Sequence, residues 1–234
     1  MKAQDVMTPN VISVSEDTTV PEIATTLLKW RISAVPVVDA KERLVGIVSE
    51  GDLVRRVETQ TDRAPPWWLA ALGDEDERAT DYVKSHGHLA RDVMTRSVVT
   101  VEEDTSVADI ANLLEAHRIK RVPVLRHSSV VGIVSRANLL HGLASADPTS
   151  PPSEDDRELR AAVLNRLRNE AGVGLASLNA TVSDRVVHLW GTALSEAQKD
   201  EIRIATESVA GVAAVEDHLT VLPPLYRQWL TNKR

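Results

Sequence analysis

The sequence has no cysteine and no phenylalanine, and aromatic residues make up only 3% of it. The absence of cysteine excludes disulfides and thiol chemistry, although it does not by itself fix the compartment. A hydrophobic fraction of 43% is enough for real cores, so these must be packed mainly with Val, Ile, Leu and Ala. A chain of 234 residues has room for one large domain or for two to three small ones.

Two further absences bear on location and partners. No apolar run approaches the roughly 18 residues that a membrane-spanning helix needs, and the first ten residues, MKAQDVMTPN, lack the apolar core of a signal peptide. We therefore expect a cytoplasmic protein. The net charge is −7, and no segment of domain length is basic, which argues against a nucleic-acid-binding surface.

The most informative feature that is present is a repeat. Each copy predicts strand, helix, strand, strand and helix, with the helices at Val20–Leu28 and Val107–Leu114 preceded by hydroxyl-and-acid capping patterns. Units this small are expected to bury their cores against each other. Three segments recur in the same order: DVMT at 5–8 and 92–95, VISVSEDTTV at 11–20 with VVTVEEDTSV at 98–107, and RISAVPVVDAKERLVGIVSEGDL at 31–53 with RIKRVPVLRHSSVVGIVSRANLL at 118–140.

A linker containing two adjacent tryptophans, Trp67 and Trp68, separates the copies. Exposed indole rings are costly, so something is expected to cover them. Packing within the pair itself is one interpretation, and a dimer contact or a lid over a ligand is the other. A short helix is expected around Tyr82 to Lys84, before the second copy begins.

After a Ser-, Pro- and Asp-rich linker at 144–156, a third unit follows. It predicts a helix over Arg157–Ala171, a hairpin of Leu178–Ser183 with Val186–Thr192, a second helix opened by a capping box at Ser195, and a last strand over Val212–Leu222.

The two DVMT starts, the R-I-x-x-V-P-V strands and the G-I-V-S-x-x-[DN]-L endings resemble a tandem pair of CBS (cystathionine-β-synthase) domains. The segments V-x-L-W-G-T-A-L-S and G-V-A-A-V-E-D-H-L-T-V resemble a BON (bacterial OsmY and nodulation) domain, although family members often have Asn where Asp217 stands.

The predicted fold class is α/β (α+β), with two βαββα CBS units packed as a pseudo-symmetric pair and a small αββαβ BON domain. The expected boundaries are CBS domain 1 at 1–58, linker at 59–88, CBS domain 2 at 89–143, linker at 144–156, BON domain at 157–222 and tail at 223–234.

The CBS resemblance implies a ligand such as AMP, ADP, ATP or a related adenosyl compound, held in a cleft at the strand ends. A carboxylate such as Asp52 can accept hydrogen bonds from both ribose hydroxyls, and Ser49 at a helix start suits ribose or phosphate. The implied ligand-binding residues are Ile12, Ser13, Ala34, Val35, Pro36, Ile47, Ser49 and Asp52 in the first copy, and Thr100, Lys120, Arg121, Val122, Ile133, Ser135 and Asn138 in the second.

Each of these assignments has a plainer alternative. Ser49 and Asp52 would also be common residues for capping a helix, and Lys120 and Arg121 could simply lie on a solvated strand edge rather than near phosphates. Asn138 lacks the charge of Asp52, so its ribose contact is expected to be weaker.

No catalytic residues, cofactor or metal are expected. His86 and His88 have no third ligand nearby in sequence, and no Ser/His/Asp order or carboxylate pair occurs in a repeated context.

We therefore predict a non-enzymatic, homodimeric sensor whose BON domain relays to a protein partner or a membrane surface. The rival hypotheses are a scaffold whose CBS repeats serve only dimerisation and, less favoured by the acidic composition, a DNA-linked regulator. Tyr226 and Trp229 make the tail a candidate interface segment.

Overall fold

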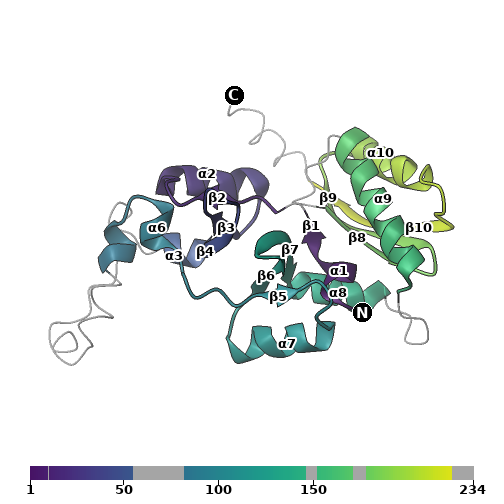
Figure 1. Ribbon diagram of the computed structural model, residues 1–234. Coiled ribbons are helices and arrows are strands. Elements are labelled where there is room, and N and C mark those ends of the chain that lie inside the picture. The colour runs from purple at the N-terminus through teal and green to yellow at the C-terminus, as the bar shows by residue number, and fades with distance from the viewer. Residues whose placement is uncertain (10, 55–81, 146–151, 171–177, 223–234) are drawn as a thin grey trace. The chain divides into compact units, whose positions relative to one another are not determined.

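The computed structural model describes residues 1–9, 11–54, 82–145, 152–170 and 178–222. It divides into two compact units. The first-repeat unit comprises Val11–Val99 and His127–Val130, and the C-terminal unit comprises Met1–Asn10, Thr100–Arg126 and Val131–Arg234. Figure 1 shows the elements of each unit along the chain.

The first-repeat unit is a small sheet with helices, in the strand order β2-β3-β4. β2 runs parallel to β3, and β3 pairs antiparallel with β4. Ile23 and Leu27 of α2 pack with the Val side chains of β3 and β4. The elements are β2 (Val14–Ser15), α2 (Val20–Trp30), β3 (Ala34–Val38), β4 (Leu44–Ser49), α3 (Glu50–Leu53), a short helix at 82–86, and α6 (Ala90–Val93).

The second repeat forms a four-stranded sheet in the C-terminal unit, in the order β1-β7-β6-β5. Its elements are α1 (Ala3–Val6), β1 (Thr8–Pro9), β5 (Val101–Glu102), α7 (Val107–Ala116), β6 (Arg121–Arg126), β7 (Ser129–Ser135) and α8 (Arg136–Ser145). Both long helices of the repeats begin as predicted. The Thr19 hydroxyl accepts from the Glu22 amide, and the Ser106 hydroxyl accepts from the Asp109 amide.

The last part of the C-terminal unit has the predicted αββαβ order. It contains α9 (Glu154–Glu170), β8 (Leu178–Ser183), β9 (Val186–Ala193), α10 (Glu196–Glu207) and β10 (Ala214–Val221). β9 lies in the middle, antiparallel to β8 and parallel to β10. α9 and α10 cover one face of this sheet (Figure 1), and their apolar side chains form one core with alternate residues of the strands.

The two DVMT segments exchange places between the repeats. The Met7 side chain, from the first repeat, packs on Gly132 of the second, where an added Cβ would lie 2.3 Å from its sulfur. Met94, from the second repeat, packs in the same way on Gly46 of the first, where an added Cβ would lie 2.4 Å from the Met94 sulfur. The glycine of each G-I-V-S motif is therefore required by the close approach of a methionine from the other copy.

Most of the predicted elements are confirmed, with two kinds of difference. The strands expected within 11–20 and 98–107 shrink to two residues each, Val14–Ser15 and Val101–Glu102. The helix predicted from Arg157 begins at Glu154 instead, because Ser153 and Asp156 form a reciprocal capping pair that the linker composition concealed. Trp67, Trp68 and the tail after 222 lie outside the described residues.

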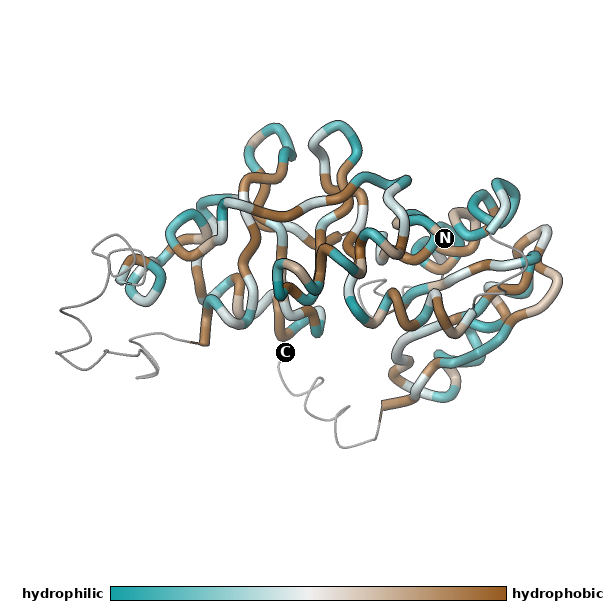
Figure 2. Tube along the Cα trace, turned by 90° about the horizontal axis from the view of Figure 1, so that it is seen from below, coloured by the Kyte–Doolittle hydropathy of each residue, from teal (hydrophilic) through white to brown (hydrophobic). Residues whose placement is uncertain are grey.

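Hydropathy follows this architecture. Figure 2 shows hydrophobic colour concentrated along strands and hydrophilic colour at many of the turns. Within the described ranges, no helix combines the length and apolar character needed to cross a membrane.

Candidate functional site

The predicted residues of the first repeat gather at one end of its sheet. Ala34 of β3 lies opposite Ser49 of β4, and Pro36 lies opposite Ile47. The Glu50 amide donates to the Ser33 carbonyl at 3.0 Å, which holds the start of α3 against the start of β3. The remaining residues of this set, Ile12 and Ser13, come immediately before β2, and Val35 is fully buried in β3.

Asp52 brings a carboxylate to this end of the sheet. One oxygen, Oδ2, accepts from the Ser49 amide at 2.9 Å and from the Ser49 hydroxyl at 2.7 Å, so the helix-start pairing does form. The other oxygen, Oδ1, lies 3.2 Å from Nζ of Lys84. A carboxylate offers about four lone-pair sites, and these three contacts leave acceptor capacity for a ligand hydroxyl.

Lys84 was not among the predicted site residues. It lies in the short helix at 82–86, within the segment interpreted as a linker, and 32 residues separate it from Asp52. Only its place between the two repeats could have drawn attention to it. Its ammonium group puts a positive charge beside the Asp52 carboxylate.

The second repeat has the same backbone arrangement with a different residue at the key position. The Arg136 amide donates to the Lys120 carbonyl at 3.2 Å, the counterpart of the contact between Glu50 and Ser33. Arg121 and Val122 open β6, Thr100 precedes β5, and Ile133 of β7 pairs with Thr8 of β1. The Oδ1 atom of Asn138 accepts from the Ser135 amide at 2.8 Å and from its hydroxyl at 2.6 Å.

Asn138 is fully engaged within the protein. It is only 4% exposed, and its Nδ2 donates to the Val6 carbonyl at 3.0 Å and to the Thr8 hydroxyl at 3.2 Å. All four of its hydrogen-bonding positions are therefore occupied. In this structure Asn138 ties α8 to the segment α1–β1.

The same segment is also bound by the C-terminal αββαβ part. The Val6 carbonyl that accepts from Asn138 also accepts from Nδ2 of Asn179 in β8, at 2.9 Å. One backbone oxygen therefore joins the second repeat to the last sheet of the chain. A carbonyl oxygen has two lone pairs, so it can accept both bonds.

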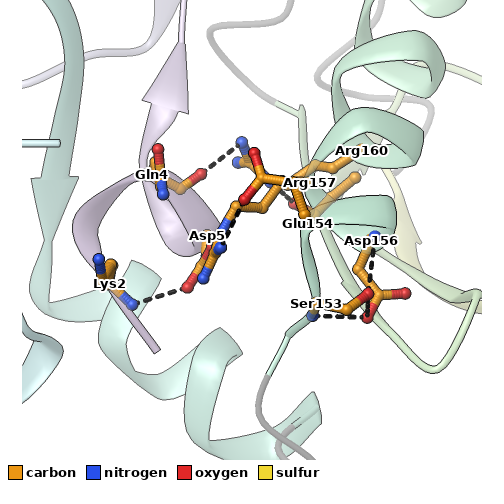
Figure 3. Close-up of polar contacts among 9 residues, drawn as sticks. Lys2, Gln4, Asp5, Ser153, Glu154, Asp156, Arg157 and Arg160 are labelled. Atoms are coloured by element: carbon orange, nitrogen blue, oxygen red, sulfur yellow. Dashed lines mark hydrogen bonds and ion pairs between the residues drawn. The ribbon is translucent and has the colours of Figure 1, made fainter. Parts of the chain in front are cut away.

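Two arginines of α9 complete this junction (Figure 3). Nε of Arg157 donates to Asp5 Oδ1 at 2.8 Å, and this bond raises the pKa of Arg157. Arg160 donates to the Gln4 carbonyl at 3.0 Å, to the Ala180 carbonyl at 2.7 Å and to the Met7 carbonyl. Burial lowers the pKa of Arg160 to about 10, so the guanidinium stays charged at neutral pH.

Comparison with known proteins agrees with the architecture. The CBS domain family matches residues 3–59 and 90–145, and the BON domain family matches residues 155–223. The chain belongs to the CBS-domain proteins and carries a BON domain after its CBS pair. Uncharacterized protein MJ1426 of Methanocaldococcus jannaschii is 30% identical to this CBS–BON protein over 154 residues, which is 61% of the chain and 91% of the relative.

Two further relatives match the CBS–BON protein at similar levels. Hypoxic response protein 1 of Mycobacterium tuberculosis is 30% identical over 141 residues, covering 60% of this chain and 84% of the relative. A crystal structure of CBSX2 in complex with AMP is 28% identical with a TM-score of 0.54, covering 61% of this chain and 96% of that chain.

Proposed function

We propose that this CBS–BON protein is a non-enzymatic sensor: its CBS pair binds an adenine nucleotide, and its BON domain passes the bound state to a protein partner or a membrane surface. The observation that carries the binding proposal is the Asp52 carboxylate, held at the strand ends of the first repeat beside Ala34 and Ser49 with acceptor capacity remaining. The likeness to CBSX2, which was crystallised with AMP, supports the choice of ligand.

The relay proposal is supported by the shared Val6 carbonyl. A phosphorylated ligand at the strand ends of the second repeat would meet Lys120 and Arg121 and would act on the neighbouring Asn138. Any shift of Asn138 alters its bond to Val6, and Asn179 of the BON domain depends on the same oxygen. Ligand binding and BON position are then coupled through one short segment.

Calorimetric titration of the full chain with ATP, AMP and adenosine tests the binding proposal. We expect one tight nucleotide per chain, at the first repeat, and a weaker second binding step, at the second repeat, that favours ATP over adenosine because Lys120 and Arg121 favour phosphates. A ligand at about 100 times its dissociation constant should stabilise the folded chain by about 2.7 kcal/mol. If none of the three binds, the ligand-free scaffold is the correct function.

We also propose that the protein is a homodimer. Leu28 on α2 is 63% exposed, and Leu140 and Leu143 on α8 are 64% and 73% exposed. Large apolar side chains left in water are a cost that association relieves. Among the described residues, α7 contributes no exposed large apolar side chain.

Sedimentation equilibrium at micromolar concentration should give a mass about twice 25.6 kDa. Replacing both Leu140 and Leu143 with Ser removes the α8 contribution and should shift the equilibrium toward the monomer. A wild-type protein that sediments as a monomer over this range would contradict the proposal.

A further inference from the structure

The BON sheet carries a group of metal-ligating side chains on the face that α9 and α10 do not cover. In the parallel pairing of β9 with β10, His188 lies opposite Glu216, and Trp190 lies opposite His218. Side chains alternate between the two faces of a strand. Since Val187 and Leu189 belong to the core under the helices, these four side chains project from the other face.

Three of these side chains bring their donor atoms together. His188 Nδ1 lies 3.2 Å from Glu216 Oε2, and His218 Nε2 lies 3.6 Å from the same oxygen. One ligand atom from each of the three residues falls within 4.8 Å of the other two. A tetrahedral zinc ion with bonds of about 2.0–2.1 Å needs its ligand atoms about 3.3 Å apart. Two of the separations are therefore close to this value already, and the third, between the two imidazole nitrogens, is at most 4.8 Å and would have to shorten.

The imidazole rings are held in place by stacking. The His218 ring stacks on Trp190 with centroids 4.0 Å apart and an interplanar angle of 9°. The Trp190 ring also stacks on His141 of α8 at 4.8 Å, and its Nε1 donates to the Thr181 hydroxyl at 3.1 Å. Ligands whose orientation is fixed before the ion arrives lose less freedom on binding.

The His188 ring has an unsatisfied nitrogen. His188 is 9% exposed. Within the described residues, its Nδ1 has no hydrogen-bond partner. Glu216 Oε2 lies within ion-pair distance of this nitrogen, but the geometry is not that of a hydrogen bond. The other two ligands are reachable from solvent, with side-chain exposures of 56% for Glu216 and 37% for His218.

We propose that His188, Glu216 and His218 bind a divalent transition-metal ion, of which Zn²⁺ is the best match, on the face of the BON sheet opposite α9 and α10. Two imidazoles and one carboxylate are a donor set that zinc favours. Three protein ligands leave a fourth position for water. This site is separate from the predicted nucleotide-binding residues and does not depend on them.

Equilibrium dialysis of the full-length chain against Zn²⁺ at pH 7.5 tests the proposal, and Co²⁺ provides a spectroscopic probe. We expect a site with a stoichiometry of one ion per chain, and visible cobalt absorption of the intensity seen for four-coordinate Co²⁺. Replacing Glu216 with Gln or His218 with Ala should weaken binding by about 10- to 100-fold or more, because even residues behind the ligands have effects of this size.

His117→Ala is the matched control, since His117 is an exposed histidine at the end of α7, and a His86→Ala, His88→Ala variant tests the rival pair. Both should bind like the wild type. Glu216→Gln preserves side-chain shape at an exposed position, so its fold should be intact by circular dichroism. The proposal is overturned if the wild type binds no Zn²⁺ or if Glu216→Gln and His218→Ala both keep wild-type affinity and cobalt absorption.

Discussion

Replacing Asp52 with Ala is expected to weaken ATP binding at the first repeat by about 10- to 100-fold. With one acceptor site remaining, the carboxylate can accept from one ribose hydroxyl in a charge-assisted hydrogen bond worth about 1.5–3 kcal/mol. Every 1.4 kcal/mol corresponds to about tenfold in affinity, and water recovers part of the loss. Asp52 is 15% exposed on its side chain, so the bond would form in a partly desolvated place where it counts for more.

The matching position of the second repeat provides the control. Because all the hydrogen-bonding groups of Asn138 are used by Ser135, Val6 and Thr8, Asn138→Ala should lower stability while changing the affinity of the tight site by less than about threefold. Calorimetric titration and thermal melts of the two variants separate these effects. If Asp52→Ala binds ATP like the wild type and Asn138→Ala loses binding, the working site lies in the second repeat.

Replacing Arg160 with Leu is expected to lower the free energy of unfolding of the C-terminal unit by about 3–5 kcal/mol, the range for removing one partner from a buried charged network. Arg160 is 6% exposed. Its guanidinium donates to the carbonyls of Gln4, Met7 and Ala180 and to the side chain of Asn179. Leucine fills part of the space but supplies none of these four hydrogen bonds to the acceptors.

Urea unfolding, with hydrogen exchange of the α1, α9 and β8 amides, measures this effect. Arg168→Ala is the matched control because Arg168 is exposed in the last turn of the same helix, and we expect it to change stability by less than about 0.5 kcal/mol. An unfolding curve for Arg160→Leu that overlays the wild type would show that α9 does not anchor the segment from Ala3 to Met7.

Local signals in the sequence were sufficient for most of the elements. The capping pairs at Thr19 and Ser106 and the alternation around Asp184 act over a few residues, so their outcome does not depend on distant parts of the chain. The two-residue turn at Asp184 and Arg185 has positive φ angles of 50° and 63°, as a tight hairpin requires. The repeat also marked Ser49 and Asp52 as a pair, and their role as ligand residues stays a prediction.

The contacts on which the proposals rest were decided only by tertiary structure. Sequence order puts Met7 with the first repeat, yet it packs on Gly132 of the second. Lys84 reaches Asp52 across 32 residues, and β9–β10 pairing places His188 next to Glu216. Alternation states which face of a strand a side chain occupies, but not which strand becomes its neighbour. Strands become neighbours when the long loops between them close. The entropic cost of closing a loop changes only slowly with its length, so this cost hardly distinguishes one neighbour from another. The packing of the finished core therefore selects which strands pair.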